Sequence, residues 1–151
     1  MTGLCAPNTN DDELLIGKIV EHEGIKKFSY KDTKDYITVG VGRCLQEGVG
    51  KGLSTDEIFY LLRNDIADFR NQLKDFDWFK SQDEVRKGAL IELCFNLGLS
   101  HLLGFKKMLD AMKAKNYPLA AKELCSSSWY TQVGVTRVND IKGRILNGRY
   151  S

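Results

Sequence analysis

The spacing of apolar residues changes near residue 24. From residue 11 to residue 23 apolar side chains recur every three to four positions, which predicts an amphipathic helix. The apolar positions are Leu14, Leu15, Ile19 and Val20. Acidic residues open this segment, as suits the positive end of a helix dipole, and Gly24 is the residue type that commonly follows a helix in the left-handed conformation. Glu23 is therefore expected in the last turn of the helix.

The next segment, residues 27–43, alternates with a period of two and is rich in β-branched and aromatic residues. This pattern predicts a β-hairpin whose polar connection is Lys31–Asp35. Gly40 and Gly42 fall inside the second predicted strand, where glycine indicates a bulge or the close approach of another backbone or a ligand. A glycine-rich loop is expected over residues 45–53.

A long helix is predicted over residues 55–73. Ser54 and Glu57 have the spacing of a capping box, in which each residue bonds the backbone N–H of the other. An apolar stripe follows at helical spacing, typical of a helix that packs against a core. Its members are Ile58, Leu62, Ile66, Phe69 and Leu73.

The remainder of the chain has a helical pattern with short connections. After an irregular link at 75–80, a second capping box at Ser81 and Glu84 is expected to open a buried central helix that Gly98 ends. Further helices are predicted at 105–115, 118–125 and 135–146, with a loop at 126–130.

The expected fold class is thus α+β, mostly α, in a single domain. Residues 1–10 form a tail, about 11–54 a small lobe with the β-hairpin, about 55–73 a connecting helix, and about 74–151 a helical-bundle lobe.

Composition restricts the possible partners and locations. The net charge of +2 over 151 residues is compatible with an anionic polymer but far from a nucleic-acid-binding signature, so no nucleic acid partner is expected. No apolar run reaches the length of a membrane-spanning helix. Residues 1–12 lack the basic and apolar regions of a secretory signal, so synthesis in a cytoplasm is expected.

Cysteines and histidines do not form a metal motif. The cysteines are too widely spaced for such a motif, and only two histidines, His22 and His101, could add ligands, so we expect no metal. The cysteines are Cys5, Cys44, Cys94 and Cys125. They would be free thiols in a reducing compartment, whereas one or two disulfides become possible outside the cell, and the sequence does not separate the three full pairings.

The candidate chemistry lies in the first fifty residues. Glu23 stands at a helix end whose partial negative charge disfavours a second negative charge, which favours the protonated carboxyl that a general acid needs. Asp32 stands in a solvated turn, where an ionised carboxylate could hold or deprotonate a water molecule, and Thr38 on the next strand could bond the same water. Two carboxylates in different environments are required for acid/base chemistry on a glycosidic bond.

Taken together, these residues resemble a known active-site signature. Glu23-Gly24, Tyr30-Lys31-Asp32-Thr33 and Tyr36-Ile37-Thr38-Val39-Gly40-Val41-Gly42 are similar to the signature of the T4-type phage lysozymes, glycoside hydrolase family 24, at all three catalytic positions. The resemblance extends over roughly residues 13–148 and implies a lysozyme-like two-lobe fold.

The resemblance implies a muramidase that hydrolyses the β-1,4 bond between N-acetylmuramic acid and N-acetylglucosamine in peptidoglycan. Glu23 would be the general acid, and Asp32 and Thr38 would position water for attack with inversion. Inversion leaves room for that water and predicts a separation of about 6.5–9.5 Å between the Glu23 and Asp32 carboxyl groups.

Further site residues follow from the same resemblance. The family pairs the catalytic glutamate with an arginine of the last helix, here Arg137, which would favour the charged form of Glu23. The implied sugar-binding residues are Gly42, Leu45, Phe95, Asn96 and Gln132, although Leu45 and Phe95 could equally be core residues. Arg43 departs from the histidine that the family often has after the Gly-x-Gly.

Two alternatives stay open. A lytic transglycosylase needs the glutamate but not the water-positioning pair, and it releases an anhydro sugar. A catalytically inactive wall-binding or scaffold domain could also use a lysozyme fold.

A monomer is expected, and a holin-like pore or an injection device would give access to the wall. The sequence does not distinguish phage lysis, attack on a rival bacterium and host defence.

Overall fold

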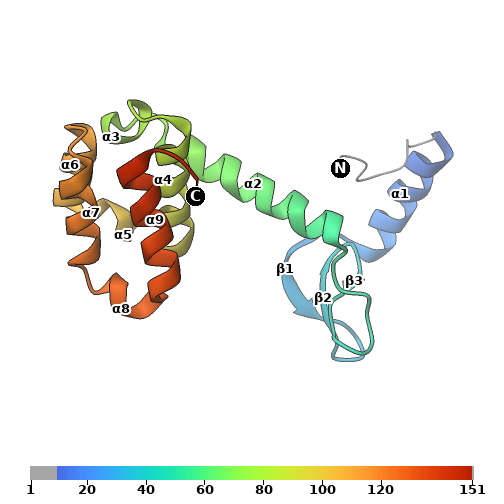
Figure 1. Cartoon of the computed structure of the whole chain (residues 1–151). Helices are drawn as coiled ribbons and strands as arrows, with labels where there is room; N and C mark the ends of the chain where they lie inside the picture. The colour runs from blue at the N-terminus through green and yellow to red at the C-terminus, as the bar shows by residue number, and fades with distance from the viewer. Residues whose placement is uncertain (1–9, 151) are drawn as a thin grey trace. The chain divides into compact units, whose positions relative to one another are not determined.

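The computed structural model describes residues 10–150, apart from the side chain of Gln132 (Figure 1). The chain divides into two compact units between residues 62 and 63. Residues 1–9 of the predicted tail, Cys5 among them, lie outside the described residues, whereas its last residue, Asn10, begins α1.

The first unit begins with α1 (Asn10–Glu23), whose bounds agree with the predicted helix to within one residue. The backbone N–H of Gly24 donates to the Val20 carbonyl at 2.8 Å, and Gly24 has a φ of +75°. The left-handed glycine therefore ends the helix, and Glu23 lies in its last turn, as predicted.

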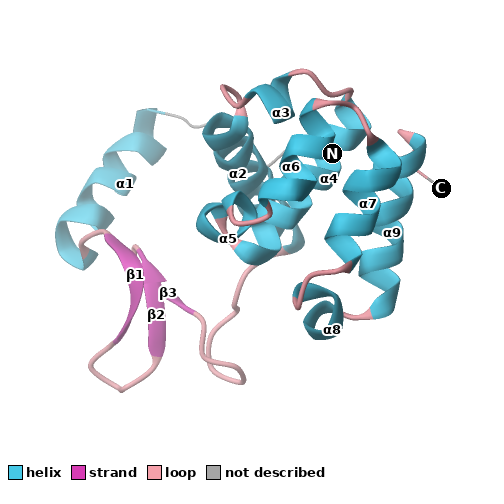
Figure 2. Cartoon of the chain, turned by 90° about the vertical axis from the view of Figure 1, so that its left-hand side faces the viewer, coloured by secondary structure: helices cyan, strands magenta, loops and turns pink. Residues whose placement is uncertain are grey.

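A three-stranded antiparallel sheet follows, made of β1 (Lys26–Lys31), β2 (Ile37–Gly40) and β3 (Arg43–Cys44) in that order (Figure 2). The predicted hairpin is confirmed, and its two strands are β1 and β2. The expectation that the second strand continues to residue 43 was wrong, because the chain reverses at Val41 and Gly42 and β3 pairs back on β2. Positive φ values of +68° at Gly40 and +69° at Gly42 produce this reversal.

Helix α2 (Thr55–Leu73) has the predicted bounds. Its capping box is formed reciprocally: the Ser54 N–H donates to Glu57 Oε1 at 2.8 Å, and the Glu57 N–H donates to Ser54 Oγ at 3.2 Å. The apolar stripe is buried at its far end, where Leu73 is fully enclosed, whereas Ile58 near the start is 49% exposed.

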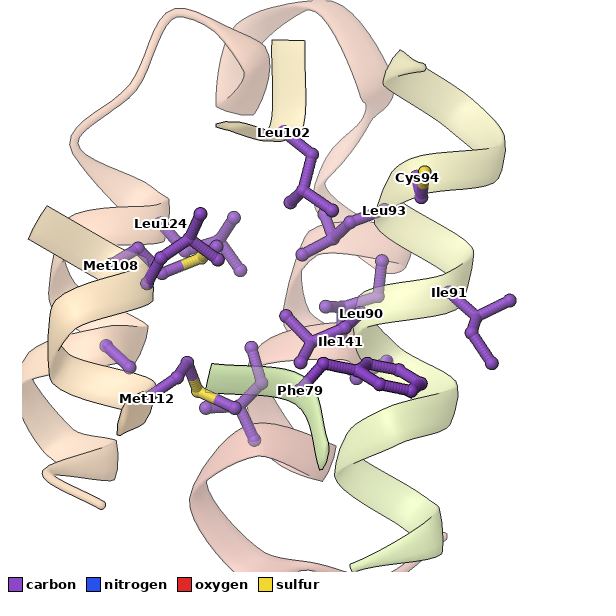
Figure 3. Close-up of a cluster of buried hydrophobic side chains, with 14 of the residues drawn as sticks. Phe79, Leu90, Ile91, Leu93, Cys94, Leu102, Met108, Met112, Leu124 and Ile141 are labelled. Carbon is purple, nitrogen blue, oxygen red and sulfur yellow. The ribbon is translucent and has the colours of Figure 1, made fainter. Parts of the chain in front are cut away.

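The second unit is helical. Its elements after α2 are α3 (Asp77–Lys80), α4 (Glu84–Leu97), α5 (Leu99–Leu103), α6 (Lys106–Lys113), α7 (Tyr117–Cys125), α8 (Trp129–Val133) and α9 (Val135–Asn147). Side chains of α4, α6 and α9, among them Leu90, Leu93, Met112 and Ile141, meet in one buried cluster (Figure 3). Helix α4 is the buried central helix that the sequence predicts, and Gly98 ends it with a φ of +83°.

Three short helices depart from the prediction. Residues 75–80 include α3 instead of an irregular link, α8 takes up residues 129–130 of the predicted 126–130 loop, and α5 was not anticipated. Each spans four or five residues, too few to display a helical period in the sequence.

The second predicted capping box was also wrong. Asp83 caps α4 by accepting from the Arg86 N–H at 3.0 Å, whereas the Ser81 hydroxyl donates to the Asp77 carbonyl at 2.8 Å. Ser81 thus belongs to the end of α3, a helix that the sequence pattern did not indicate.

Candidate functional site

Glu23 lies at the exposed end of α1, close to the turn that joins β2 to β3. A Cβ atom built on Gly42 would be only 3.2 Å from Glu23 Oε2. The carboxylate therefore lies against bare backbone, at a residue whose φ of +69° also favours glycine. The family resemblance assigned Gly42 to sugar binding, and in the structure this glycine lies beside Glu23, the predicted general acid.

Asp32 is fixed in the turn between β1 and β2. Its Oδ1 atom accepts from the Lys34 N–H at 2.8 Å and from the Tyr36 N–H at 2.9 Å. The backbone of Asp32 also takes part, because its N–H donates to the Tyr36 carbonyl at 3.0 Å. These bonds are those of an aspartate that stabilises its own turn, and they also give the carboxylate a defined position.

Thr38 is enclosed in the sheet, with 3% of its surface exposed. It lies opposite Tyr30 on β1 and Cys44 on β3. Its hydroxyl donates to the Tyr36 carbonyl at 3.0 Å, which leaves the oxygen lone pairs able to accept a hydrogen bond.

The backbone of Tyr36 connects the last two groups. Its N–H binds the Asp32 carboxylate, and its carbonyl accepts from the Thr38 hydroxyl. Asp32 and Thr38 are consequently held by one peptide segment. Sequence reasoning missed Tyr36, because a backbone role leaves no mark on the residue type.

The other predicted binding residues have local contacts. Leu45 is partly buried, and its N–H donates to the Ile37 carbonyl at 2.7 Å. Phe95 is 49% exposed and meets Phe69 edge to face, with ring centroids 5.7 Å apart. Leu45 belongs to the first unit and Phe95 to the second.

Asn96 lies near the end of α4, where its Oδ1 accepts from the indole Nε1–H of the buried Trp129 at 2.7 Å. This bond ties α4 to α8 and engages the side chain of a residue that was predicted to bind sugar. The backbone of Gln132 belongs to α8, whereas its side chain lies outside the described part of the chain.

Arg137 lies in the first turn of α9, with its Nε atom 3.7 Å from Glu92 Oε1. Glu92 also pairs with Arg144, which is almost fully enclosed and is 2.9 Å from Asp140. Burial disfavours the charge of Arg144, but the hydrogen bond and charge of Glu92 together with Asp140 prevail and raise the pKa of the guanidinium. Pairing of Arg137 with Glu23 stays a prediction.

A hollow of about 490 Å³ lies beside this charge cluster, lined by Glu92, residues 133–137 and Asp140. Sequence reasoning did not single out Glu92. The available signal was one acidic residue within the apolar run Leu90-Ile91-Glu92-Leu93.

Arg43 and Glu57 form an ion pair within the first unit. Arg43 Nη1 is 2.8 Å from Glu57 Oε1 and 2.6 Å from Glu57 Oε2. The backbone N–H of Ser54 first, and then Arg43, lower the pKa of the Glu57 carboxyl from 4.5 to about 2.

Metal-binding clusters and membrane-spanning helices are both missing from the described residues. In residues 10–150 there is no group of three or more histidine, cysteine or acidic side chains placed to hold a metal ion. Nor does a helix in that range have both the length and the apolar character needed to cross a membrane. Cys44, Cys94 and Cys125 are free thiols, and burial raises the pKa of Cys94.

Two carboxylates in different environments, one at an exposed helix end and one in a partly buried turn, are the groups that most glycoside hydrolases use. Comparison with known proteins points to the same class. The phage lysozyme family model matches residues 20–145, and the chain belongs to that family.

Individual relatives include two proteins of Dictyostelium discoideum and one of a phage. "Probable T4-type lysozyme 1" is 28% identical over 137 residues, which cover 73% of this chain and 81% of the relative. "Probable T4-type lysozyme 2" is 27% identical with the same coverage. The pre-baseplate central spike protein Gp5 of Enterobacteria phage T4 is 26% identical over 83% of this chain, which corresponds to 26% of Gp5.

Proposed function

We propose that this protein is a muramidase that hydrolyses the β-1,4 bond between N-acetylmuramic acid and N-acetylglucosamine in bacterial peptidoglycan. Membership in the phage lysozyme family supports glycoside hydrolysis. The observation that carries the proposal furthest is that Tyr36 binds both Asp32 and Thr38, since a carboxylate and a hydroxyl held together suit the binding of one water molecule.

In this mechanism Glu23 donates its proton to the glycosidic oxygen as the bond to the anomeric carbon breaks. Asp32 accepts a proton from the attacking water, and Thr38 orients that water by accepting a hydrogen bond from its other O–H, which stays on the product hydroxyl. The water oxygen bonds to the anomeric carbon on the face opposite the leaving group. The product is a reducing N-acetylmuramic acid end with inverted configuration, which requires the predicted separation of about 6.5–9.5 Å between the two carboxyl groups.

The remaining roles in the proposal are supportive. Arg137 would pair with Glu23, and Gly42, Leu45, Phe95, Asn96 and Gln132 would contact the glycan. The reaction as written needs no metal or organic cofactor. Access to the wall would require a pore or an injection device, and similarity to a baseplate spike protein supports the second route.

A lytic transglycosylase is the second candidate, because it would use Glu23 in the same position. It differs in its product, since the muramic acid hydroxyl attacks the anomeric carbon in place of water. A pair of groups suited to holding water therefore favours hydrolysis.

Mass spectrometry of soluble fragments released from purified peptidoglycan distinguishes these reactions. We expect muropeptides with reducing N-acetylmuramic acid ends, each carrying one oxygen from the solvent when the digestion is run in ¹⁸O-labelled water. Anhydro ends without label would replace the proposal with the transglycosylase. Bound wall without released fragments would indicate the inactive binding domain.

A further inference from the structure

Arg43 makes three contacts through one nitrogen atom. Its Nη1 donates to both Glu57 carboxylate oxygens, at 2.8 and 2.6 Å, and to the Gly52 carbonyl at 3.2 Å. The side chain is 28% exposed, so solvent screens this interaction only in part. The contacts join β3 to the end of the 45–53 loop and to the start of α2.

Glu57 is itself held in place. Its Oε1 accepts from the Ser54 N–H, and its own N–H donates to the Ser54 hydroxyl. Arg43 therefore binds an acceptor fixed by the first turn of a helix, which is a firmer anchor than a freely rotating surface carboxylate.

Arg43 is directly bonded to Gly42, the residue against which the Glu23 carboxylate lies. Strand β3, which follows the turn containing Gly42, has only two residues, paired with β2 as Val39↔Arg43 and Thr38↔Cys44. The side-chain contacts of Arg43 therefore add to a short stretch of backbone pairing. A displacement of Arg43 would move the Gly42 backbone and change the space available to Glu23.

We infer that Arg43, held by its ion pair with Glu57, is a positioning residue that keeps the Gly42 backbone against the Glu23 carboxylate. This inference rests on the proposed function, because it assigns the effect to the general acid. Arg43 touches none of the reacting atoms in this role. Its loss should misplace proton delivery and shift one of the five proposed glycan contacts, Gly42, so kcat should fall by a larger factor than KM rises.

The test compares Arg43→Met, Arg43→Lys and Glu57→Gln with wild type on purified peptidoglycan. Methionine keeps the apolar stem and removes the guanidinium, so kcat should fall by about 10-fold or more, since displacement of a reacting group by about 1 Å can cost far more than this. Lysine keeps a cation and should recover part of that loss. Glutamine keeps the capping box and weakens the bond to Arg43, so it should give an intermediate kcat.

Ser54→Ala is the matched control. It removes the hydroxyl that caps α2 and should lower the melting temperature, but it leaves the Arg43–Glu57 contact intact. Its kcat should match wild type at a temperature where circular dichroism shows every variant folded. If Ser54→Ala loses as much kcat as Arg43→Met, the effect is general destabilisation and the inference is wrong.

Two other results would overturn the inference. Wild-type kcat in Arg43→Met would show that the Arg43–Glu57 ion pair has no influence on Glu23. A raised KM with unchanged kcat would assign Arg43 to substrate binding instead. The wild-type assay is read first, because failure to release reducing ends there contradicts the proposed function, whereas the variants address the positioning residue alone.

Discussion

At the scale of single residues, the site depends on small contacts that fix where two carboxylates point. Glu23 lies against a glycine at the end of a β-turn, and Asp32 is held by two backbone N–H groups. Thr38 shares the Tyr36 backbone with Asp32. These contacts give each group a defined place before any glycan binds, and such preorganisation favours catalysis.

Gly42→Ala tests the contact at Glu23. The new methyl group would be 3.2 Å from Glu23 Oε2 and should push the carboxylate aside, lowering kcat by about 10-fold or more. The positive φ adds a cost of about 1 kcal/mol in stability. Turnover and urea unfolding would be measured on the same samples.

Gly40→Ala serves as the control for that experiment. Gly40 has nearly the same φ, +68°, but no atom within 4 Å of an added Cβ. It should lose similar stability and keep the wild-type kcat. Equal losses of kcat in the two variants would show that backbone strain, and not the contact with Glu23, matters.

At this scale the sequence predicted the positions of residues that depend on local patterns, such as helix ends and turns. A glycine after a helical pattern located Glu23, and a polar connection between β-patterned segments located Asp32. The apposition of Gly42 to Glu23 could not be predicted, since it depends on the path of β3. Neither could the bonds to the Tyr36 backbone, nor the bond between Asn96 and Trp129, which links residues 33 positions apart.

At the scale of elements, capping and turn chemistry decide the boundaries. The capping box of α2 was predicted from Ser54 and Glu57 and formed with both bonds. The same spacing at Ser81 and Glu84 failed because Asp83 stands closer to the helix start and competes for the role. A spacing rule thus identifies candidates, and the neighbouring residues select among them.

The Arg43–Glu57 pair should make the stability of the first unit depend on pH. Hydrogen bonds from Ser54 and Arg43 lower the pKa of Glu57 from 4.5 to about 2, so the charged form is favoured in the folded state. The resulting stabilisation is fully present above the unfolded value and is lost as the pH falls from about 4.5 towards 2.

Urea unfolding of wild type and Glu57→Gln at about pH 6 and about pH 2.5 measures this dependence. The free energy of unfolding of wild type should exceed that of Glu57→Gln by more at the higher pH than at the lower pH. The control is Glu47→Gln, a substitution at an exposed carboxylate in the 45–53 loop. Its difference from wild type in the free energy of unfolding should change less between the two pH values. An advantage that stays constant with pH would contradict the assignment.

At the scale of the whole molecule, the candidate catalytic groups and the main hydrophobic core belong to different units. Glu23, Asp32 and Thr38 are in the first unit, whereas the buried cluster around Leu90, Leu93 and Ile141 is in the second. Periodicity predicted the α+β, mostly α class and the long helices. It missed the one-turn helices and the third strand, whose formation depends on tertiary contacts.

Turnover of Glu23→Gln on purified peptidoglycan tests the central claim most directly, with Asp32→Asn measured beside it. Loss of the general acid should reduce the release of reducing ends by about 10²–10⁴-fold or more, and loss of the base should also reduce it by orders of magnitude. Circular dichroism and wall binding should match wild type in both variants. Wild-type turnover in Glu23→Gln would contradict the account.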